Sequence, residues 1–348
     1  MVQALVDGLA GRKGIELHHV NLPLSRDSGD IGRIRPGKLW VLLRACLKAR
    51  QFARANDFDT LYYVPAPGKR SALYRDWIAM ALCRPAFRRL ILHWHASGLG
   101  EWLRTRATAP ERRLTLRSLG GADLSIVLAE SLRADADLLG AKRLAVVPNG
   151  IADPCPCLAH APGINNPFCV LFLGLCSEEK GLFDVAEAVV AANLQIDVSG
   201  QAPALALTAA GPFPNSATRD RFSRLVAMHP AALRHAGVVT GEQKHLLFLQ
   251  SHAMCLPTHY PHEGQPLVLL EAMAYDLPVV STRWGAIPET VPAGGAQLVS
   301  PKNLPELTQA LLSVRASPPP AGIMRQHFLS RFSLTAHLDA LARALQSA

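Results

Sequence analysis

The stretch "THYPHEGQPLVLLEAMAYDLPVVSTRWGAIPET", residues 258–290, places two carboxylates eight positions apart, Glu263 in a polar loop and Glu271 inside an apolar run. Carboxylates are rarely buried without hydrogen-bonding partners, so this pattern needs a chemical reason. The preceding run "AMCLPTH", residues 253–259, predicts a buried strand. The apolar run from Pro266 predicts a helix, because proline is well placed at the first helical position. Both glutamates therefore lie close to where a helix leaves the carboxyl end of a strand.

The start of this predicted helix has the properties of an anion site. The N–H groups near Gly264 and Gln265 have no partner within the helix, and the helix dipole is positive at this end. A sugar nucleotide fits the site, with its phosphates on the helix end, its sugar hydroxyls on Glu263 and its ribose hydroxyls on Glu271. The alternative interpretation is a first-turn glutamate favoured by the dipole and an ordinary buried one.

Both halves of the chain alternate short β-rich runs with helical patterns, which is typical of parallel sheets wrapped by helices. We therefore predict an α/β protein with two Rossmann-like, doubly wound domains that face each other across a cleft. Residues 152–167 are rich in Pro, Ala and Asn and predict a linker. The predicted divisions are an acceptor-side domain over 1–155, a nucleotide-sugar-binding domain over 156–325, and a C-terminal helix over 326–348 that packs back toward the first domain.

The beginning of the chain departs from the usual order of a doubly wound domain. Such a domain normally opens with a strand and a glycine-rich turn that leads into the first helix. Here "MVQALVDGLAGR", residues 1–12, already has a helical pattern, and "IELHHVNL", residues 15–22, reads as the next strand. We therefore expect the first strand and its glycine-rich turn to be missing, either because the sheet lacks an edge element or because the chain has been shortened at its start.

Composition favours a globular protein in a reducing compartment. Of the 348 residues, 49% are hydrophobic and 18% charged, which argues against disorder. No window reaches the roughly 18 apolar residues of a membrane span, and the start lacks the order of a secretory signal. The seven cysteines show no C-x2-C pairing, so reduced thiols in a cytoplasm are the simplest interpretation.

Positive charge is concentrated in the first half. Residues 1–160 have 24 Lys/Arg against 14 Asp/Glu, a balance of +10, whereas residues 161–348 have 12 against 13, a balance of −1. This asymmetry indicates an anionic partner for the first half. Nucleic acid is not expected, because aromatic and basic residues are not interleaved. The run 32–56, "GRIRPGKLWVLLRACLKARQFARAN", is either a helix that lies on anionic lipid or a surface helix that covers a sheet.

Five segments together resemble one enzyme family. The region from Glu263 to Glu289 resembles the E-x7-E region of family 4 glycosyltransferases, which are retaining enzymes of the GT-B fold. Four other segments agree with this family in order and spacing. They are "ILHWHASG" at 91–98, "AVVPNGI" at 145–151, "VLFLGLCSEEKG" at 170–181 and "GVVTGEQKHLLFLQSHAMCLPTH" at 237–259.

The resemblance implies a role for particular residues. Glu263 would contact the hydroxyls of the donor sugar as a catalytic residue, Glu271 would bind the ribose, and Lys180 would neutralise the diphosphate. His95 would be the catalytic residue that approaches the sugar from the first domain. The remaining implied residues are Gly264, Gln265 and Pro266 at the phosphate-facing helix end, Val239 and Thr240 near the base, and Asn149 and Gly150 at the entry to the hinge.

Alternatives remain for some of these residues. Lys180 could be a solvated residue at a helix start, although lysine is unfavourable there unless an anion is near. His95 could be structural, and His93 lies on the same strand face, so the two cannot be separated. Arg75 and Asp76 are interpreted as structural. Family members usually have an arginine where this chain has Leu175, so Lys180 and the helix end would hold the diphosphate without it.

The sequence is therefore interpreted as a retaining glycosyltransferase. It would move a sugar from a nucleotide-diphosphate sugar to a saccharide or lipid-linked acceptor in bacterial cell-surface polysaccharide or glycolipid biosynthesis. We expect a cytoplasmic protein, peripheral on the inner face of the plasma membrane, with an anionic membrane surface as a partner. No cofactor or obligatory metal is expected, because no Asp-x-Asp cluster appears that would hold a metal against a diphosphate. The alternatives are a catalytically impaired or partner-dependent sugar-nucleotide-binding protein and a GT-B sugar-nucleotide epimerase.

Overall fold

A computed structural model of the chain describes residues 2–12, 14–21, 36–156, 167–196 and 203–347. It divides into two compact units, of which the first comprises 1–148 and 338–348 and the second 149–337. The division after Pro148 falls seven residues before the predicted boundary at 155, and the second unit extends beyond 325 to His337. The predicted linker lies largely outside the described residues.

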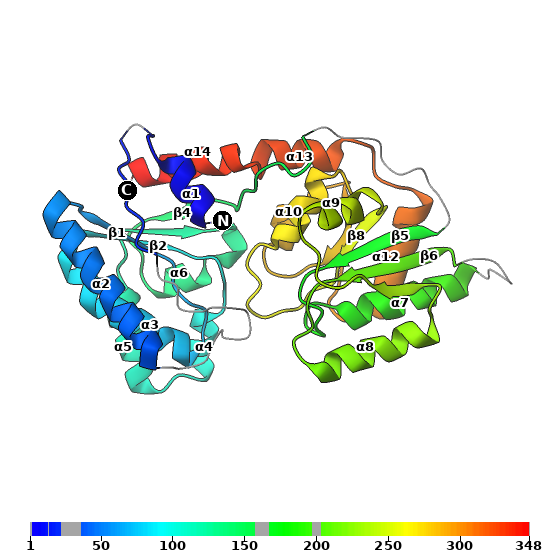
Figure 1. Cartoon of the computed structure of the whole chain (residues 1–348), viewed down its shortest axis with the longest axis horizontal. Coiled ribbons are helices and arrows are strands. Elements are labelled where there is room, and N and C mark those ends of the chain that lie inside the picture. Colours follow the sequence, from blue (N-terminus) through cyan, green and yellow to red (C-terminus); the bar gives the residue numbers. More distant parts are fainter. Residues whose placement is uncertain (1, 13, 22–35, 157–166, 197–202, 348) are drawn as a thin grey trace. The chain divides into compact units, whose positions relative to one another are not determined.

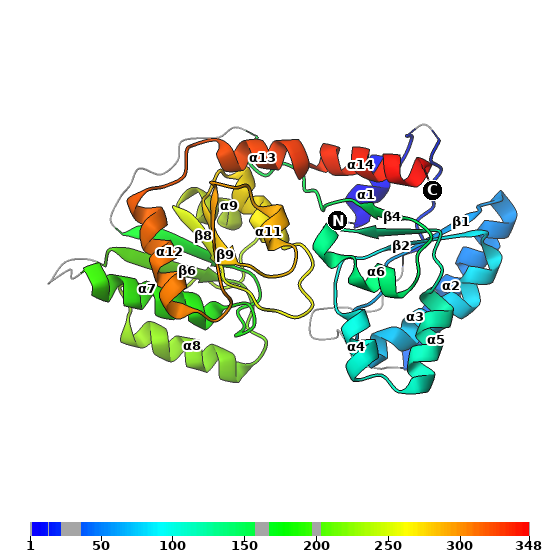
Figure 2. The same ribbon diagram turned by 180° about the vertical axis from the view of Figure 1, so that it is seen from behind.

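The first unit is built on a parallel sheet of four described strands in the order β1-β2-β3-β4. Figures 1 and 2 show α3 and α5 on one face of this sheet and α1 on the other. The core between β2, β3 and the helices contains Leu73, Leu92 and Val127, which are fully buried. The elements are α1 (Val2–Leu9), α2 (Pro36–Asn56), β1 (Thr60–Tyr63), α3 (Arg70–Cys83), η2 (Arg84–Ala86), β2 (Arg89–His93), α4 (Leu99–Thr105), α5 (Ala109–Leu119), β3 (Leu124–Val127), η3 (Glu130–Leu132), α6 (Ala134–Leu138) and β4 (Leu144–Val146).

The second unit contains a six-stranded parallel sheet in the order β10-β9-β8-β5-β6-β7. Figures 1 and 2 show α7 and α8 on one face of this sheet and α9 and α10 on the other. The apolar runs 168–173 and 253–256 form its central strands, which are buried as expected for strands covered on both faces. The elements are β5 (Phe168–Leu173), α7 (Leu182–Ile196), β6 (Leu205–Ala210), α8 (Ser216–Met228), β7 (Leu233–His235), α9 (Gly241–Leu249), β8 (Ala253–Leu256), α10 (Leu267–Ala274), β9 (Val279–Thr282), α11 (Ile287–Thr290), β10 (Ala296–Val299), α12 (Leu304–Ala316) and α13 (Ile323–Arg331). The last helix, α14 (Leu334–Gln346), begins in this unit, and its residues from Leu338 on belong to the first unit.

The prediction of a strand at 15–22 is wrong for its described part, because residues 15–21 are irregular. Instead of joining a sheet, the His18 ring stacks on the Phe52 ring of α2 with centroids 3.4 Å apart. At His18 this segment therefore packs against a helix and is not part of a ladder.

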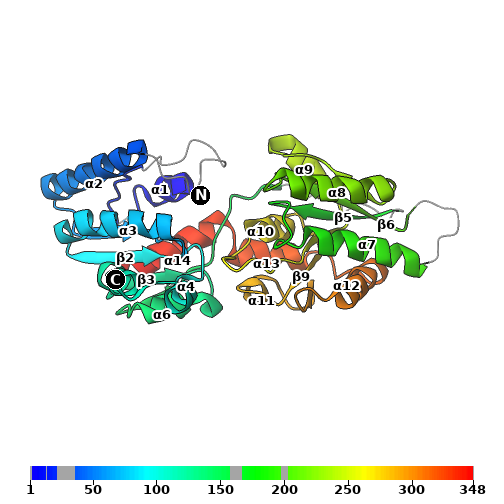
Figure 3. The same cartoon turned by 90° about the horizontal axis from the view of Figure 1, so that it is seen from below.

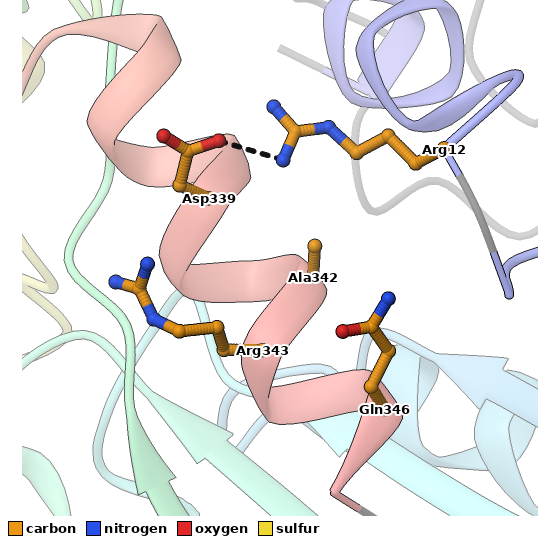
Figure 4. A pocket seen from close by; sticks show the side chains of 5 residues that line it. All are labelled: Arg12, Asp339, Ala342, Arg343 and Gln346. Carbon is orange, nitrogen blue, oxygen red and sulfur yellow. Dashed lines mark hydrogen bonds and ion pairs between the residues drawn. The ribbon is translucent and has the colours of Figure 1, made fainter.

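The N-terminal segment contacts the end of the C-terminal helix within the first unit. The Arg12 guanidinium donates to the Asp339 carboxylate at 2.7 Å, and Gly8 lies so close to Leu338 that a Cβ there would meet its side chain at 2.3 Å. Figure 4 shows Arg12 reaching across a pocket of about 330 Å³ beside α14. This pocket is lined by Arg12, Asp339, Ala342, Arg343 and Gln346. None of these residues belongs to the site predicted from the sequence.

Among the described residues, no helix combines the length and the apolarity needed to cross a bilayer.

Candidate active site

Two loops of the second unit lie at the point where its strand order reverses. From β5 the chain continues outward through β6 and β7, and then returns to build β8, β9 and β10 on the other side of β5. β5 and β8 are therefore neighbours whose following loops, 174–181 and 257–266, leave the same edge of the sheet. In open α/β sheets, the carboxyl edge at such a switch point is where ligands bind.

The two loops are joined by a buried ion pair. The Lys180 ammonium lies 2.6 Å from Oε2 of Glu263, and Glu263 is only 8% exposed. The Thr258 hydroxyl, itself fully buried, donates to the same carboxylate oxygen at 2.9 Å. The Lys180 ammonium also lies 5.0 Å from the centre of the Tyr260 ring, within the range of a cation–π contact. The structure therefore brings together Lys180 and Glu263, two of the residues singled out from the sequence.

The backbone of the first loop is fixed by its approach to the second. Gly181 has a φ of +81°, and a Cβ at this position would meet the Pro257 carbonyl oxygen at 2.5 Å. Only glycine tolerates both conditions, and α7 begins directly after it, at Leu182. Burial raises the pKa of the Cys176 thiol in the same loop to about 12, so Cys176 is not a thiolate nucleophile at neutral pH.

The side chain of Gln265 holds the second loop to neighbouring backbone. Its Oε1 accepts from the Asn149 N–H at 2.7 Å, and its Nε2 donates to the Thr290 hydroxyl at 3.1 Å. Asn149 is the first residue of the second unit, so Gln265 ties the segment that enters this unit to the candidate site. Gly150 follows in a tight position, where a Cβ would meet the Ser333 carbonyl oxygen at 2.7 Å.

The start of α10 is not capped by a side chain. Pro266 is its N-cap residue, with an extended backbone and no side-chain hydrogen bond to the first turn. Gly264, Gln265 and Pro266 are buried beside it. The first-turn N–H groups of an uncapped helix are suited to an anion, as the sequence pattern predicts.

Glu271 has a partner that the sequence analysis missed. Its Oε1 lies 2.5 Å from the Lys244 ammonium of α9, and both side chains are partly exposed, at 21% and 32%. The contact joins two helices that start near the same sheet edge. Val239 and Thr240, the predicted base residues, lie directly before α9, and the predicted ribose residue Glu271 lies on α10, with β8 between the two helices in the chain. Lys244 stands in the quoted run 237–259, but nothing in its spacing indicates a partner 27 positions away.

His95 belongs to the first unit, two positions after the end of β2. Its ring lies 4.2 Å from that of the fully buried His93, centroid to centroid, and the Tyr62 hydroxyl hydrogen-bonds Nδ1 of His93. The two histidines therefore form one packed group with Tyr62 at the carboxyl end of the first sheet. This agrees with the sequence interpretation, which could not separate His93 from His95.

Asp-x-Asp pairs occur in the first unit, although not in the donor-binding half. The Asp135 carboxylate of one pair accepts from the N–H groups of Gly98, Leu99 and Gly100 at 2.7–3.1 Å, so it caps the start of α4. In the other pair, Asp59 accepts from the Thr60 hydroxyl. Among the described residues, no group of three or more His, Cys, Asp or Glu is arranged to hold a metal ion.

Leu175, where the family usually has an arginine, is 42% exposed in the loop after β5. A leucine contributes no charge to this loop. An arginine from another element, Arg221 of α8, contacts this loop through an ion pair with Glu178 at 3.4 Å. The Arg221 guanidinium also lies over the Phe183 ring.

Two parallel-sheet units, with paired charges at the switch point of the second, define the GT-B class of glycosyltransferase fold, and comparison with solved structures confirms this fold. Sucrose-phosphate synthase from Thermosynechococcus elongatus is similar over 90% of this chain and 80% of its own, with a TM-score of 0.66 and 19% identity. The Anabaena protein HepE in complex with UDP and glucose is similar over 91% of this chain and 84% of its own, with a TM-score of 0.65 and 19% identity.

Sequence comparison shows a family match within the second unit. Residues 167–316, which are 150 of the 189 residues of the second unit, match the family described as Glycosyl transferases group 1, so this segment is similar to that family. The MMP α-(1→4)-mannosyltransferase of Mycolicibacterium hassiacum is 38% identical over 82 residues, which are 23% of this chain and 20% of that protein. The match thus spans about a fifth of the length of this relative. The predicted resemblance to glycosyltransferases is thus confirmed for residues 167–316.

Proposed function

We propose that this chain is a family 4 glycosyltransferase that transfers a sugar from a nucleotide-diphosphate sugar to a saccharide or lipid-linked acceptor, with retention of anomeric configuration. The observation that carries the proposal is the ion pair of Lys180 and Glu263 at the switch point of the second unit, within the residues that match the group 1 family. A donor supplies both partners that this buried pair is suited to, namely phosphate oxygens for the ammonium and sugar hydroxyls for the carboxylate. The complex of HepE with UDP and glucose supports a donor of this kind.

In the proposed reaction, the bond between the anomeric carbon and the diphosphate oxygen breaks, and a bond to an acceptor hydroxyl oxygen forms. The departing nucleoside diphosphate takes the bonding electrons and gains negative charge, and the proton of the acceptor hydroxyl passes to an oxygen of that departing diphosphate. Lys180 and the uncapped start of α10, with Gly264, Gln265 and Pro266, would stabilise that charge, so we propose that no cofactor or metal is obligatory. Glu263 would hold the sugar, and His95 would approach it from the first unit.

The remaining proposed contacts recognise the nucleoside. Glu271 would accept hydrogen bonds from the ribose hydroxyls, and Val239 and Thr240 would lie beside the base. The finer setting we propose is bacterial cell-surface polysaccharide or glycolipid assembly, in a cytoplasmic protein that is peripheral on the inner face of the plasma membrane. The positive balance of residues 1–160 supports this setting.

A nucleotide screen on wild type and Glu271→Ala tests the donor site. We expect thermal shift and calorimetry to show saturable binding of one diphosphate among UDP, GDP and ADP, and of its sugar conjugates, but not of CMP. Binding should weaken about tenfold in Glu271→Ala, because ribose loses a charged acceptor. Glu187→Ala, an exposed glutamate on α7, is the matched control and should bind as wild type. Absence of binding to all nucleotides in wild type would contradict the proposed function.

Lys244→Met tests the ion pair beside the proposed ribose site. Lys244 fixes one oxygen of Glu271, so the wild type should prefer the ribonucleoside diphosphate over its 2′-deoxy form, and the variant should lose about half or more of that preference. Lys244→Arg, which keeps the charge, should retain it. Calorimetric dissociation constants for the two nucleotides give the ratio directly. An unchanged ratio in Lys244→Met would show that Glu271 acts without this lysine.

A second candidate function is a sugar-nucleotide-binding protein with impaired turnover. The exposed, uncharged Leu175 favours it, because this loop then has one positive charge fewer beside the diphosphate. Donor binding without product or donor hydrolysis, in the presence of candidate acceptors, would support this function over the first. An epimerase, the third function considered, would convert the donor with no acceptor present.

A further inference from the structure

Helix α2 combines uniform positive charge with an exposed apolar face. Its 21 residues include five Lys or Arg and no Asp or Glu. One side of the helix is buried: Leu42 and Cys46 are 3% and 4% exposed and pack with Ala79 and Cys83 of α3. Figure 3 shows α2 alongside α3 at an outer edge of the first unit. The opposite side of α2 therefore faces away from the core of its own unit.

This outward side contains large apolar residues. Trp40 is 69% exposed, Leu47 is 54% exposed and Leu39 is 47% exposed. Trp40 and Leu47 are seven positions apart, so they lie on the same side of the helix two turns from each other. The exposed Arg44 lies one turn after Trp40, and the exposed Lys48 lies one turn after Arg44. Large apolar residues gathered on a monomer surface indicate a binding face more often than single exposed ones do.

We propose that this face of α2, defined by Leu39, Trp40, Arg44, Leu47 and Lys48, docks on an anionic lipid bilayer. Trp and Leu would enter the boundary between headgroups and acyl chains, where tryptophan is favoured. Arg44 and Lys48 would contact the negatively charged headgroups. An acidic protein surface would pair with Arg44 and Lys48 but would not bury Trp40 in an apolar layer. Nucleic acid would pair with the same cations but has no apolar surface for Leu39 and Leu47.

The inference rests on the proposed membrane setting and deepens it, because it assigns the surface that contacts lipid, and it needs no donor. It gives a physical reason for the concentration of positive charge in residues 1–160. A lipid-linked acceptor would be held in the surface on which the first unit docks. Lipid binding is measured without nucleotide, so it can fail while donor binding succeeds, and the reverse.

Vesicle co-sedimentation of the full chain tests the proposal. We expect binding to phosphatidylcholine vesicles that contain phosphatidylglycerol, little binding to pure phosphatidylcholine, and weaker binding as salt is raised. The double variants Trp40→Ser/Leu47→Ser and Arg44→Glu/Lys48→Glu should each lower the partition coefficient about tenfold or more. Leu194→Ser is the matched control, since Leu194 is 77% exposed on α7, a helix without Lys or Arg, and should bind as wild type.

Further readouts separate docking from misfolding and from other partners. All four substituted positions are exposed, so thermal unfolding of the variants should match wild type. The change in tryptophan emission on adding anionic vesicles should be lost in Trp40→Phe. The proposal is overturned if the double variants bind vesicles as well as wild type does, if wild type binds neither vesicle, or if light scattering shows a dimer that Trp40→Ser/Leu47→Ser abolishes.

Discussion

Replacing Lys180 with methionine is expected to weaken nucleoside-diphosphate binding about a hundredfold, because the diphosphate loses a charge-assisted hydrogen bond in a largely buried site. The same change should lower the free energy of unfolding by about 3 kcal/mol, since it leaves the buried Glu263 carboxylate without its ammonium partner. Isothermal titration with the diphosphate identified in the nucleotide screen gives the first quantity, and urea unfolding gives the second.

A double variant separates these two effects. In Lys180→Met/Glu263→Gln both charges are removed, so stability should largely return, because no unpaired charge stays buried and Thr258 can still hydrogen-bond the amide. Diphosphate binding should stay weak, since the phosphate still lacks its ammonium. Recovery of binding in the double variant would show that the lysine acts only by neutralising Glu263, and would remove it from the proposed donor site.

Asp76→Ala is expected to destabilise the first unit by about 3–5 kcal/mol. Asp76 is fully buried, and its carboxylate accepts from the Tyr63 hydroxyl, the Ala66 N–H and the Arg75 guanidinium, each at 2.7 Å. Burial raises the pKa of Asp76, and the Arg75 cation opposes this rise. Removing the carboxylate leaves three donors without their acceptor, one of them charged and one in the loop that follows β1.

Urea unfolding of Asp76→Ala beside Asp59→Ala provides the measurement and its control. Asp59 is a half-exposed carboxylate with a distant ion pair to Arg89 at 3.8 Å, so its removal should change stability by less than about 0.5 kcal/mol. Nucleotide affinity should be unchanged in Asp76→Ala, because the proposed donor contacts are in the second unit. A small loss of stability for Asp76→Ala would mean that water or a rearranged Arg75 satisfies the donors.

Much of the fold could be predicted because its signals are local. The buried strands β5 and β8 are short apolar runs, and α10 begins beside Pro266. Lys180 could be singled out because the motif at 170–181 that carries the family resemblance is a short continuous run, and because a lysine at a helix start is unfavourable unless an anion is near. The prediction of a strand at 15–21 was wrong, and the structure shows instead that His18 of this segment packs on Phe52 of α2.

Contacts between distant segments could not be predicted in the same way. Thr258 begins the run 258–290 that predicts the site, but no pattern in that run shows that its hydroxyl donates to the Glu263 oxygen that also contacts Lys180. That contact depends on the pairing of β5 with β8. Gln265 was assigned to the phosphate-facing helix end, whereas its side chain contacts Asn149 and Thr290.

The sequence by itself determined the two α/β halves, the family of the second and the residue types of the candidate site, because periodicity and motif spacing are properties of short segments. The tertiary structure decided which of these residues meet. Lys180 reaches Glu263 across 83 positions because strand order makes their loops neighbours, and Lys244 reaches Glu271 because α9 and α10 pack on one face. Strand order and helix packing depend on the free energy of the whole fold, which no local pattern contains.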